Sequence, residues 1–330
     1  NPGLPWEPDL PLAFPPTGKS RLYPYPDSAM NLLQLISSML TGRRKRSPRK
    51  KVLVLEGGGM RGIFLTGVLQ AFSDAGYFPW RLIIGSSAGA LTGTAYAARQ
   101  IHHARDAFFT KLLSGDFIKL SNILRSEKHI LNLDWMVDTI INGDDPLDLA
   151  RLKKACPVLI TATQCGANRT PETIYLDPRR DDVITALKAT AAIPFLYRGF
   201  VEYRDYHLLD GGLLDPIPYR RALQAGFEEK DILVVVTRKK GYRKREESFW
   251  IKSLYEAYYK DPKHQGLVRA LHNRYLEYNR LLNDLEFRHR DIQIIYPPDD
   301  FRVDRLTQDE KKILEGFEQG IAAARAFLRG

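Results

Sequence analysis

The sequence has little cysteine and no metal-binding pattern. Only two of its 330 residues are cysteines, Cys156 and Cys165, which is too few for a disulfide framework and gives no sign of an oxidising compartment. Both lie on or beside a predicted strand, and we interpret them as core or strand-end residues. No spacing typical of metal ligands is present, so we expect neither a metal nor another cofactor.

Long hydrophobic runs are also lacking. No apolar segment approaches the roughly 20 residues that a helix needs to cross a bilayer, which argues against a membrane-spanning protein. Hydrophobic residues make up 44% of the chain and charged residues 27%, as in an ordinary globular protein. We therefore expect a cytoplasmic protein whose contact with a membrane, if any, is peripheral.

Outside one short segment, the sequence carries little net charge. Seven basic residues and no acidic residue lie within residues 43–51, and they account for most of the formal net charge of +10. The other 321 residues carry only +3, which is not typical of a nucleic-acid-binding surface. Binding of nucleic acid through residues 43–51 is an alternative, but we do not expect nucleic acid to be a partner.

Residues 1–50 form a predicted N-terminal region of their own. Eight of the twenty prolines fall within residues 1–26, and proline at this density favours an extended arm. Apolar residues recur at helical spacing in residues 30–40, which predicts a short amphipathic helix before the basic linker. Such a helix beside a polybasic segment suits an anionic membrane, so residues 30–51 are a candidate membrane contact. The alternatives are a helix packed on the main domain and a solvated linker.

Strands alternate with helices from residue 51 to about residue 240. Apolar runs predict buried strands at 52–55, 82–84, 158–162 and 232–236. Helical patterns lie between them at 63–75, 88–100 and 183–192. This alternation predicts an α/β sandwich with right-handed crossovers.

Residues 241–330 are predicted to form a helical C-terminal extension of the same domain, which would span residues 51–330. Helical patterns cover about 248–260, 266–288 and 308–328, with a strand-like segment at 292–296. The basic loop at 238–245 is interpreted as a solvated turn.

A glycine-rich segment, GGGMRG at residues 57–62, follows the first predicted strand. Glycines allow a ligand to approach the backbone closely, and successive N–H groups at the start of a helix attract negative charge. The segment formally fits the dinucleotide-binding pattern G-x-G-x-x-G. That fold requires an acidic residue after the second strand, whereas this strand ends in Gly85-Ser86-Ser87. We therefore reject the nucleotide interpretation.

The second strand leads directly into GSSAG at residues 85–89. This is the pattern G-x-S-x-G at a strand-to-helix junction, the context of a nucleophile elbow. Ser87, not Ser86, lies symmetrically between the two glycines, so Ser87 is the predicted nucleophile. The alternative is a serine that only caps the following helix.

The serine needs a base, and the histidines offer no good candidate. None of the seven lies in a glycine-rich or strand-end context, and His207 belongs to a predicted aromatic strand at 203–209. Asp210, by contrast, ends an apolar strand and is followed by two glycines. Burial would raise its pKa toward that of a useful base. The alternative is a simple Asp-Gly hairpin, and Asp215 is interpreted as the cap of the next helix.

Taken together, GGGMRG, GSSAG and DGG at residues 210–212 resemble the patatin-like acyl hydrolase and phospholipase family. The family pattern is G-G-G-x-[RK]-G, G-x-S-x-G and D-G-[AG], and all three parts are complete here. The resemblance covers roughly residues 51–240, including the segment 189–197. It implies an α/β fold, a three-layer sandwich with a mostly parallel central sheet, followed by C-terminal helices that resemble those of a bacterial subgroup.

The resemblance implies a serine-dependent lipid acyl hydrolase of the phospholipase A or esterase type, acting on a phospholipid or other acyl lipid. It implies a dyad of Ser87 as nucleophile and Asp210 as proton acceptor, with Gly58 and Gly59 holding the oxyanion. The supporting motif positions are Gly57, Arg61, Gly62, Gly85, Gly89, Gly211 and Gly212. For Arg61, we favour a structural role in the loop over attraction of an anionic head group.

Two other classes of function stay open from the sequence. One is a membrane- or partner-binding protein whose active site is vestigial. The other is a Ser–His–Asp α/β-hydrolase that uses Ser87, Asp210 and a downstream histidine such as His264 or His272. Labelling of Ser87 by an active-site probe discriminates the first from an enzyme, and substitution of those histidines discriminates the second from a dyad.

Overall fold

The structure, a computed structural model, describes residues 50–113, 117–119, 122, 129–143, 145–166 and 170–330. The proline-rich arm, the predicted helix at 30–40 and most of the basic segment lie outside the described residues. Within them, Lys50 donates through Nζ to the carbonyl of Lys230, and Lys51 forms a 2.8 Å ion pair with Asp231. These two lysines of the basic segment therefore anchor the chain to the main domain.

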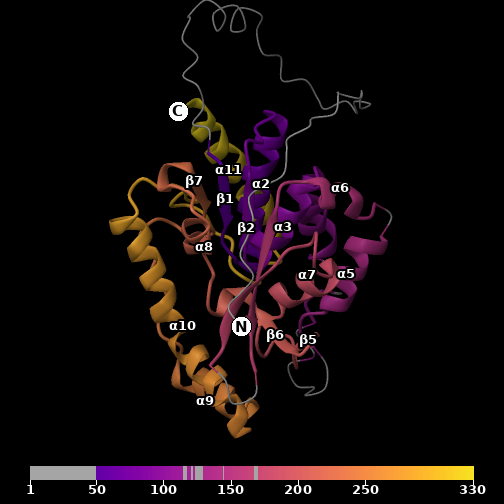
Figure 1. The fold of residues 1–330 in the computed structure, drawn as a ribbon, viewed down its shortest axis with the longest axis vertical. Coiled ribbons are helices and arrows are strands. Elements are labelled where there is room, and N and C mark those ends of the chain that lie inside the picture. Colours follow the sequence, from indigo (N-terminus) through magenta and orange to yellow (C-terminus); the bar gives the residue numbers. More distant parts are fainter. Residues whose placement is uncertain (1–49, 114–116, 120–121, 123–128, 144, 167–169) are drawn as a thin grey trace, which may run out of the picture. The chain divides into compact units, whose positions relative to one another are not determined.

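An eight-stranded sheet forms the centre of the fold (Figure 1). Its strands are β1 (Val52–Leu55), β2 (Leu82–Gly85), β3 (Val158–Gln164), β4 (Glu172–Leu176), β5 (Val201–Tyr203), β6 (Tyr206–Asp210), β7 (Ile232–Val235) and β8 (Gln293–Ile295). Hydrogen-bonded neighbours follow the path β5-β6-β3-β2-β1-β7-β8, and β4 also pairs with β3. Strands β3, β2, β1, β7 and β8 run parallel, and β4, β5 and β6 add antiparallel pairs. The mostly parallel sheet predicted from the sequence is confirmed.

Helices cover both faces of this sheet, as a three-layer sandwich requires. The helices are α2 (Gly62–Asp74), α3 (Ala88–Ala97), α4 (Ile101–Asp106), α5 (Leu133–Asn142), α6 (Leu149–Lys154), α7 (Val183–Ala191), α8 (Tyr219–Gln224), α9 (Phe249–Tyr258), α10 (Gln265–Asn283) and α11 (Glu310–Arg329). Leu53 and Leu55 of β1 face the core of α2, α3, α7 and α11. Val52 and Val54 face the core of α8 and the C-terminal half of α10. This alternation along one strand buries both faces of the sheet.

The C-terminal helix α11 packs directly along α2. A Cβ atom at Gly67 of α2 would lie 2.1 Å from the carbonyl oxygen of Phe317, and one at Gly320 of α11 would lie 2.2 Å from the carbonyl oxygen of Phe64. The two helix backbones are therefore too close for any side chain at these positions. Helix α2 begins at Gly62, the last residue of the glycine-rich segment. Packing of α11 therefore supports the helix that follows this segment.

We expect Gly320→Ala to lower the free energy of unfolding by roughly 1–3 kcal/mol or more, because the added methyl group meets a backbone that cannot move aside cheaply. Urea denaturation would measure this loss. Glu318→Ala, on the exposed side of the same helix, is the matched control and should change the stability by less than about 0.5 kcal/mol. Equal stability of the two variants would contradict this account of the α2–α11 contact.

Several local expectations are corrected by the structure. The predicted aromatic strand at 203–209 is instead a hairpin of β5 and β6 that turns at Arg204, whose φ is +53°. The basic loop at 238–245 is not a solvated turn, because it packs on α10, where Asn279 pairs with the backbone N–H and carbonyl of Lys244. Strand β4 and the helices α4, α5, α6 and α8 were not predicted.

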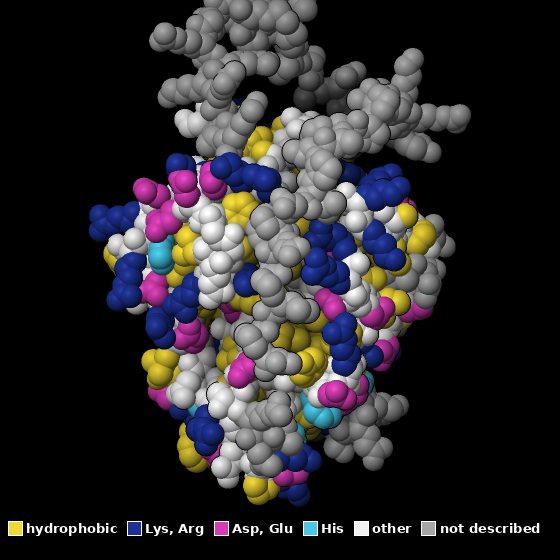
Figure 2. Space-filling view, viewed as in Figure 1, with side chains coloured by type: hydrophobic (Ala, Val, Ile, Leu, Met, Phe, Trp, Pro, Cys, Tyr) yellow, Lys and Arg dark blue, Asp and Glu magenta, His cyan; other side chains and the backbone are white. Residues whose placement is uncertain are grey.

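The described surface shows mixed charge and no spanning helix. On the face drawn in Figure 2, lysine and arginine side chains are interspersed with aspartate and glutamate. Within the described residues, no helix combines the length and the apolar character that crossing a bilayer would require.

Cys156 and Cys165 are free thiols at the two ends of β3, and burial raises the pKa of each to about 12. Both are therefore core or strand-end residues, as predicted, and their raised pKa disfavours the reactive thiolate.

Candidate active site

Ser87 occupies a sharp turn between β2 and α3. Its backbone has φ +50° and ψ −125°, a strained conformation for a residue with a side chain. The flanking glycines make the turn possible. A Cβ at Gly85 would lie 2.6 Å from the backbone of Ala90, and one at Gly89 would lie 2.5 Å from the carbonyl oxygen of Leu55. The geometry is that of a nucleophile elbow.

The two serines of this turn differ in their surroundings. The Ser86 side chain is fully buried, and its hydroxyl has no hydrogen-bond partner among the described residues. Ser87 is 6% exposed, and its backbone N–H donates to Oγ1 of Thr190 at 2.8 Å. Ser87 also borders two pockets, which Ser86 does not. Only Ser87 is therefore placed to meet a substrate.

The sheet topology brings Asp210 to the end of β2. Strand β4 occupies one edge of β3, so β2 and β6 share the other edge. There Ile160 of β3 pairs with Gly85, and Ala162, two residues further on, pairs with Asp210. Strands β2 and β6 therefore approach each other head to head along β3. The last residue of β6 meets the elbow that follows β2.

The Asp210 carboxylate is buried beside Ser87. Its Oδ1 accepts a 2.6 Å hydrogen bond from the N–H of Gly212, whereas its buried Oδ2 has no hydrogen-bond partner among the described residues. Burial raises the pKa of Asp210 to about 6, against the opposing effects of the Ser87 hydroxyl, the Gly212 N–H, Arg305 and Arg274. The contact with Ser87 is thus close but looser than a formed hydrogen bond, as is common in an unliganded site.

Asp210 does not form a simple Asp-Gly hairpin. It caps a short 3-10 helix, Gly211–Leu213, which follows β6 directly. A Cβ at Gly211 would lie 2.1 Å from Oγ1 of Thr161, so this glycine allows the turn to pack on β3. The capping bond to Oδ1 holds the carboxylate in place, while Oδ2 has no hydrogen-bond partner among the described residues.

The glycine-rich segment contacts the elbow. A Cβ at Gly57 would lie 3.1 Å from Cβ of Ser87, and Gly59 has φ +57°, a conformation that favours glycine. The N–H groups of Gly57 and Met60 donate to the carbonyls of Pro216 and Arg305. Those of Gly58 and Gly59, between them, donate to no atom of the described part of the chain. Two adjacent backbone donors without a partner among the described residues therefore lie in the segment that contacts the elbow.

Arg61 and Gly62 complete this segment. Gly62 begins α2 and packs against Ala88, since a Cβ there would lie 2.8 Å from Cβ of Ala88. Arg61 is 3% exposed, and its Nε and Nη1 have no hydrogen-bond partner among the described residues. Burial, with Arg238 and Arg305 nearby, lowers the pKa of Arg61 to about 10. The arginine is charged at neutral pH and incompletely satisfied by the protein.

Two pockets meet at Ser87. The first, which we call the apolar pocket, is lined mainly by aliphatic and aromatic side chains, including those of Leu91, Phe108, Leu112, Leu131, Met136 and Leu187. The second, which we call the polar pocket, is lined by the glycine-rich segment, Asp210 and charged side chains, including those of Glu56, Arg61, Lys244 and Arg305. Ser87, Gly59 and Arg305 border both pockets.

The histidines proposed for a triad lie elsewhere. His264 packs against the rings of Phe200 and Tyr259, and His272 lies 3.7 Å from the carboxylate of Glu256. Neither borders the apolar or the polar pocket. His207 pairs with Glu202 on the hairpin of β5 and β6. No histidine of the described residues borders the polar pocket, which contains the Asp210 side chain.

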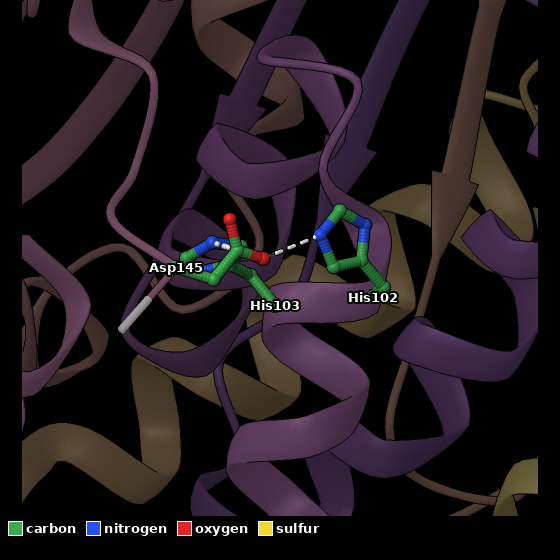
Figure 3. A group of neighbouring side chains, drawn as sticks. All are labelled: His102, His103 and Asp145. Carbon is green, nitrogen blue, oxygen red and sulfur yellow. Dashed lines mark hydrogen bonds and ion pairs between the residues drawn. The ribbon is translucent and has the colours of Figure 1, made fainter. Parts of the chain in front are cut away.

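One group of side chains outside the dyad has metal-ligand character. His102, His103 and Asp145 have ligand atoms within 4.8 Å of one another, and Figure 3 shows the carboxylate between the two imidazoles. The Asp145 oxygen lies 2.8 Å from Nε2 of His102 and 3.2 Å from that of His103. These contacts already satisfy the three groups among themselves. Adjacent histidines in a helix gave no sequence signal for this cluster.

Asp215 does not cap the next helix, contrary to the sequence interpretation. Helix α8 begins after Pro218, without a side-chain cap, and Asp215 instead accepts a 2.7 Å hydrogen bond from the hydroxyl of Tyr175 on β4. Burial raises the pKa of Asp215 to about 6. It ties the loop after Asp210 to the sheet.

The sequence analysis missed four groups of the site. Thr190 fixes the elbow backbone, and Glu56 is buried between the hydroxyl of Tyr278 and the N–H of Thr237. Arg274 and Arg305 reach the polar pocket from the C-terminal extension. Glu56 could have been noticed as an acid directly after a buried strand, but no local pattern marks the other three.

Sequence comparisons agree with the geometry over most of the chain. The family model of the patatin-like phospholipases matches residues 53–223, and that of a domain of unknown function (DUF6363) matches residues 264–330. An uncharacterized protein of Escherichia coli, YjjU, is 27% identical over 86% of this chain and 79% of its own length. The uncharacterized NTE family protein Rv1063c of Mycobacterium tuberculosis is 31% identical over 53% of this chain, which spans less than half of that relative.

A structural comparison gives a more distant likeness. VipD from Legionella pneumophila aligns over 89% of this chain and 72% of its own, with 15% identity and a TM-score of 0.48. The family match covers more than half of the chain, including the glycine-rich segment, the elbow and Asp210. The chain therefore belongs to the patatin-like phospholipase family, a family of hydrolases that act on lipid esters.

Proposed function

We propose that this protein is a serine-dependent lipid acyl hydrolase that uses Ser87 and Asp210 as a catalytic dyad. The observation that carries the proposal is the strained elbow at Ser87, which holds the hydroxyl beside a buried carboxylate whose second oxygen is free among the described residues. The apolar pocket next to Ser87 supports an acyl chain as the substrate group.

In the first half-reaction, Oγ of Ser87 attacks the carbonyl carbon of the ester while Oδ2 of Asp210 takes its proton. The carbonyl oxygen becomes an oxyanion, and the free N–H groups of Gly58 and Gly59 donate to it. The intermediate collapses with cleavage of the bond to the alcohol oxygen. The alcohol leaves with the proton from Asp210, and the acyl group stays on Ser87.

In the second half-reaction, water takes the place of the alcohol. The water oxygen attacks the acyl carbon while Asp210 accepts a proton from the water. The N–H groups of Gly58 and Gly59 again donate to the oxyanion. The bond to Oγ then breaks, and Ser87 recovers its proton from Asp210. A base whose pKa is raised to about 6 suits both directions of transfer near neutral pH.

The alternatives receive less support from the site. A triad needs a histidine between serine and carboxylate, but His264 and His272 border neither pocket. A vestigial site would tolerate an incomplete constellation, whereas the proposed nucleophile, base and backbone donors are all present. The membrane contact at residues 30–51 stays a prediction, since residues 30–49 lie outside the described residues.

We expect a fluorophosphonate probe to label the wild-type protein at Ser87, with a bond from Oγ to phosphorus and loss of fluoride. Asp210→Asn should react at least about 100-fold more slowly, because the hydroxyl loses its proton acceptor. Mass spectrometry of the labelled peptide separates Ser87 from Ser86. Folded wild-type protein that resists the probe would favour the vestigial interpretation, and labelling that survives in Asp210→Asn would refute the dyad.

A further inference from the structure

Five cationic side chains border the polar pocket: Arg61, Arg238, Lys244, Arg274 and Arg305. Two carboxylates border it as well, those of Glu56 and Asp210, and Glu247 forms an ion pair with Arg274 from just outside. Five positive charges thus face three negative ones. When all of these groups are ionised, the pocket beside Ser87 carries an excess of two positive charges.

Four of these cations lack a carboxylate partner. Among the described residues, Arg61, Arg238, Lys244 and Arg305 form no ion pair, unlike many surface arginines and lysines of this chain. Two of the arginines also contain buried nitrogens without a hydrogen-bond partner there: Nε and Nη1 of Arg61, and Nε of Arg274. Leaving buried charged donors unsatisfied is costly, so the arrangement points to an anion that is not part of the protein.

The titration of Lys244 agrees with this charge excess. Burial, together with Arg274 and Arg305, lowers the pKa of its ammonium group to about 7. Glu247 opposes this effect, and Arg61 adds to it. The lysine is therefore crowded by like charges and would gain from an anion between them.

Most of these cations come from the C-terminal part of the chain. Arg238 and Lys244 lie on the loop after β7, Arg274 on α10, and Arg305 between β8 and α11. All four follow residue 223, where the match to the patatin-like family ends, and two of them lie within the domain of unknown function. Only Arg61 belongs to the glycine-rich segment.

Resting on the proposed function, we propose that the C-terminal extension builds a binding site for the phosphomonoester group of an acyl lipid. The two pockets meet at Ser87, so an ester carbonyl at Ser87 can direct its acyl chain into the apolar pocket and a nearby phosphate into the polar pocket. An acyl glycerol phosphate has this layout. The extension would thus select substrates by their head group.

A phosphomonoester fits the pocket better than other anions. It carries about −1.5 to −2 charges at pH 7 and three terminal oxygens, which matches an excess of two charges and several guanidinium donors. A phosphodiester or a carboxylate brings one charge and two free oxygens, and would leave more of the four unpaired cations unsatisfied. An uncharged glycerol ester would leave all four unpaired cations unsatisfied.

Binding is tested with glycerol 3-phosphate and, separately, with inorganic phosphate, by calorimetric titration of the full chain. Lys244→Gln removes one cation of the pocket, and we expect it to weaken the binding of glycerol 3-phosphate at least about tenfold. Lys240→Gln is the matched control, since Lys240 is exposed on the same loop and outside the pocket. Its affinity should equal that of the wild type. Equal affinity of both variants, or no binding to the wild type, would overturn the site.

Kinetics then test the substrate. For 1-acyl glycerol 3-phosphate against the matched monoacylglycerol, we expect kcat/KM to favour the phosphomonoester, and the ratio to fall at least about tenfold in Lys244→Gln but not in Lys240→Gln. Hydrolysis without this preference would refute the head-group site and keep the proposed hydrolase. Binding of glycerol 3-phosphate without hydrolysis of any ester would keep the site and refute the hydrolase. Inorganic phosphate that binds as tightly as glycerol 3-phosphate, without a kinetic preference for the phosphomonoester, would indicate a soluble-anion site instead.

Discussion

Ser87→Ala should reduce the hydrolysis of every acyl substrate by roughly 10⁴-fold or more, to a level set by the remaining parts of the site. Among the described residues, Ser87 carries the only hydroxyl that borders both pockets, and this variant removes it. Removal of a nucleophile in a comparable serine hydrolase has effects of this size, because the acyl-enzyme route disappears entirely. Steady-state rates with a soluble short-chain ester measure the loss.

The matched control is Ser86→Ala, one residue away in the same turn. The Ser86 hydroxyl is buried and has no partner among the described residues, so its removal leaves no donor or acceptor unsatisfied. We expect this variant to keep a rate within a few-fold of the wild type. If Ser86→Ala were the inactive variant and Ser87→Ala the active one, the assignment of the nucleophile would be wrong.

The second large effect is expected for Asp210→Asn, which should lower kcat by about 10³-fold or more. An asparagine can still accept the capping hydrogen bond of Gly212 through its oxygen, so the turn stays in place. It cannot accept the proton of Ser87, and general-base catalysis of both half-reactions is lost. Survival of more than a tenth of the wild-type rate would contradict the role of Asp210.

The pH dependence separates this role from a merely structural one. Since burial raises the pKa of Asp210 to about 6, the wild-type rate should fall as the pH drops through 6, where the carboxylate becomes protonated, and should level off above about pH 7. Asp210→Asn should lack this acidic limb in its residual rate. A wild-type profile that stays flat from pH 5 to pH 8 would exclude a base with this pKa.

The same shift gives a stability test that does not depend on activity. An aspartate whose pKa is higher in the folded than in the unfolded state binds more protons when folded, so its contribution to stability falls as the pH rises from about 4 to about 6 and stays low above that. Asp210→Asn avoids this loss. We expect the variant to melt at the same or a higher temperature than the wild type at pH 8, which would show that lost activity is not lost folding.

Local sequence patterns were enough to predict the sheet strands next to the site and the chemical identity of its central residues. Apolar runs predicted β1, β2 and β7, because a buried parallel strand must be apolar on both faces. The G-x-S-x-G pattern predicted Ser87 because only glycines fit where Gly85 and Gly89 contact backbone atoms. The position of Asp210 at a strand end was likewise readable, since its signal lies within three adjacent residues.

What the tertiary structure alone decided is which distant residues share the site. The head-to-head approach of β2 and β6 along β3 places Asp210 beside Ser87, and no local pattern encodes that pairing. The basic loop after β7 was interpreted as a solvated turn because its residues are polar. In the structure the loop packs on α10, and Lys244 borders the polar pocket. Arg274 and Arg305 gave no signal for the same reason. The sequence around a lysine or arginine in a helix or loop does not show whether the side chain faces water or a binding site. Only the fold determines which of the two it faces.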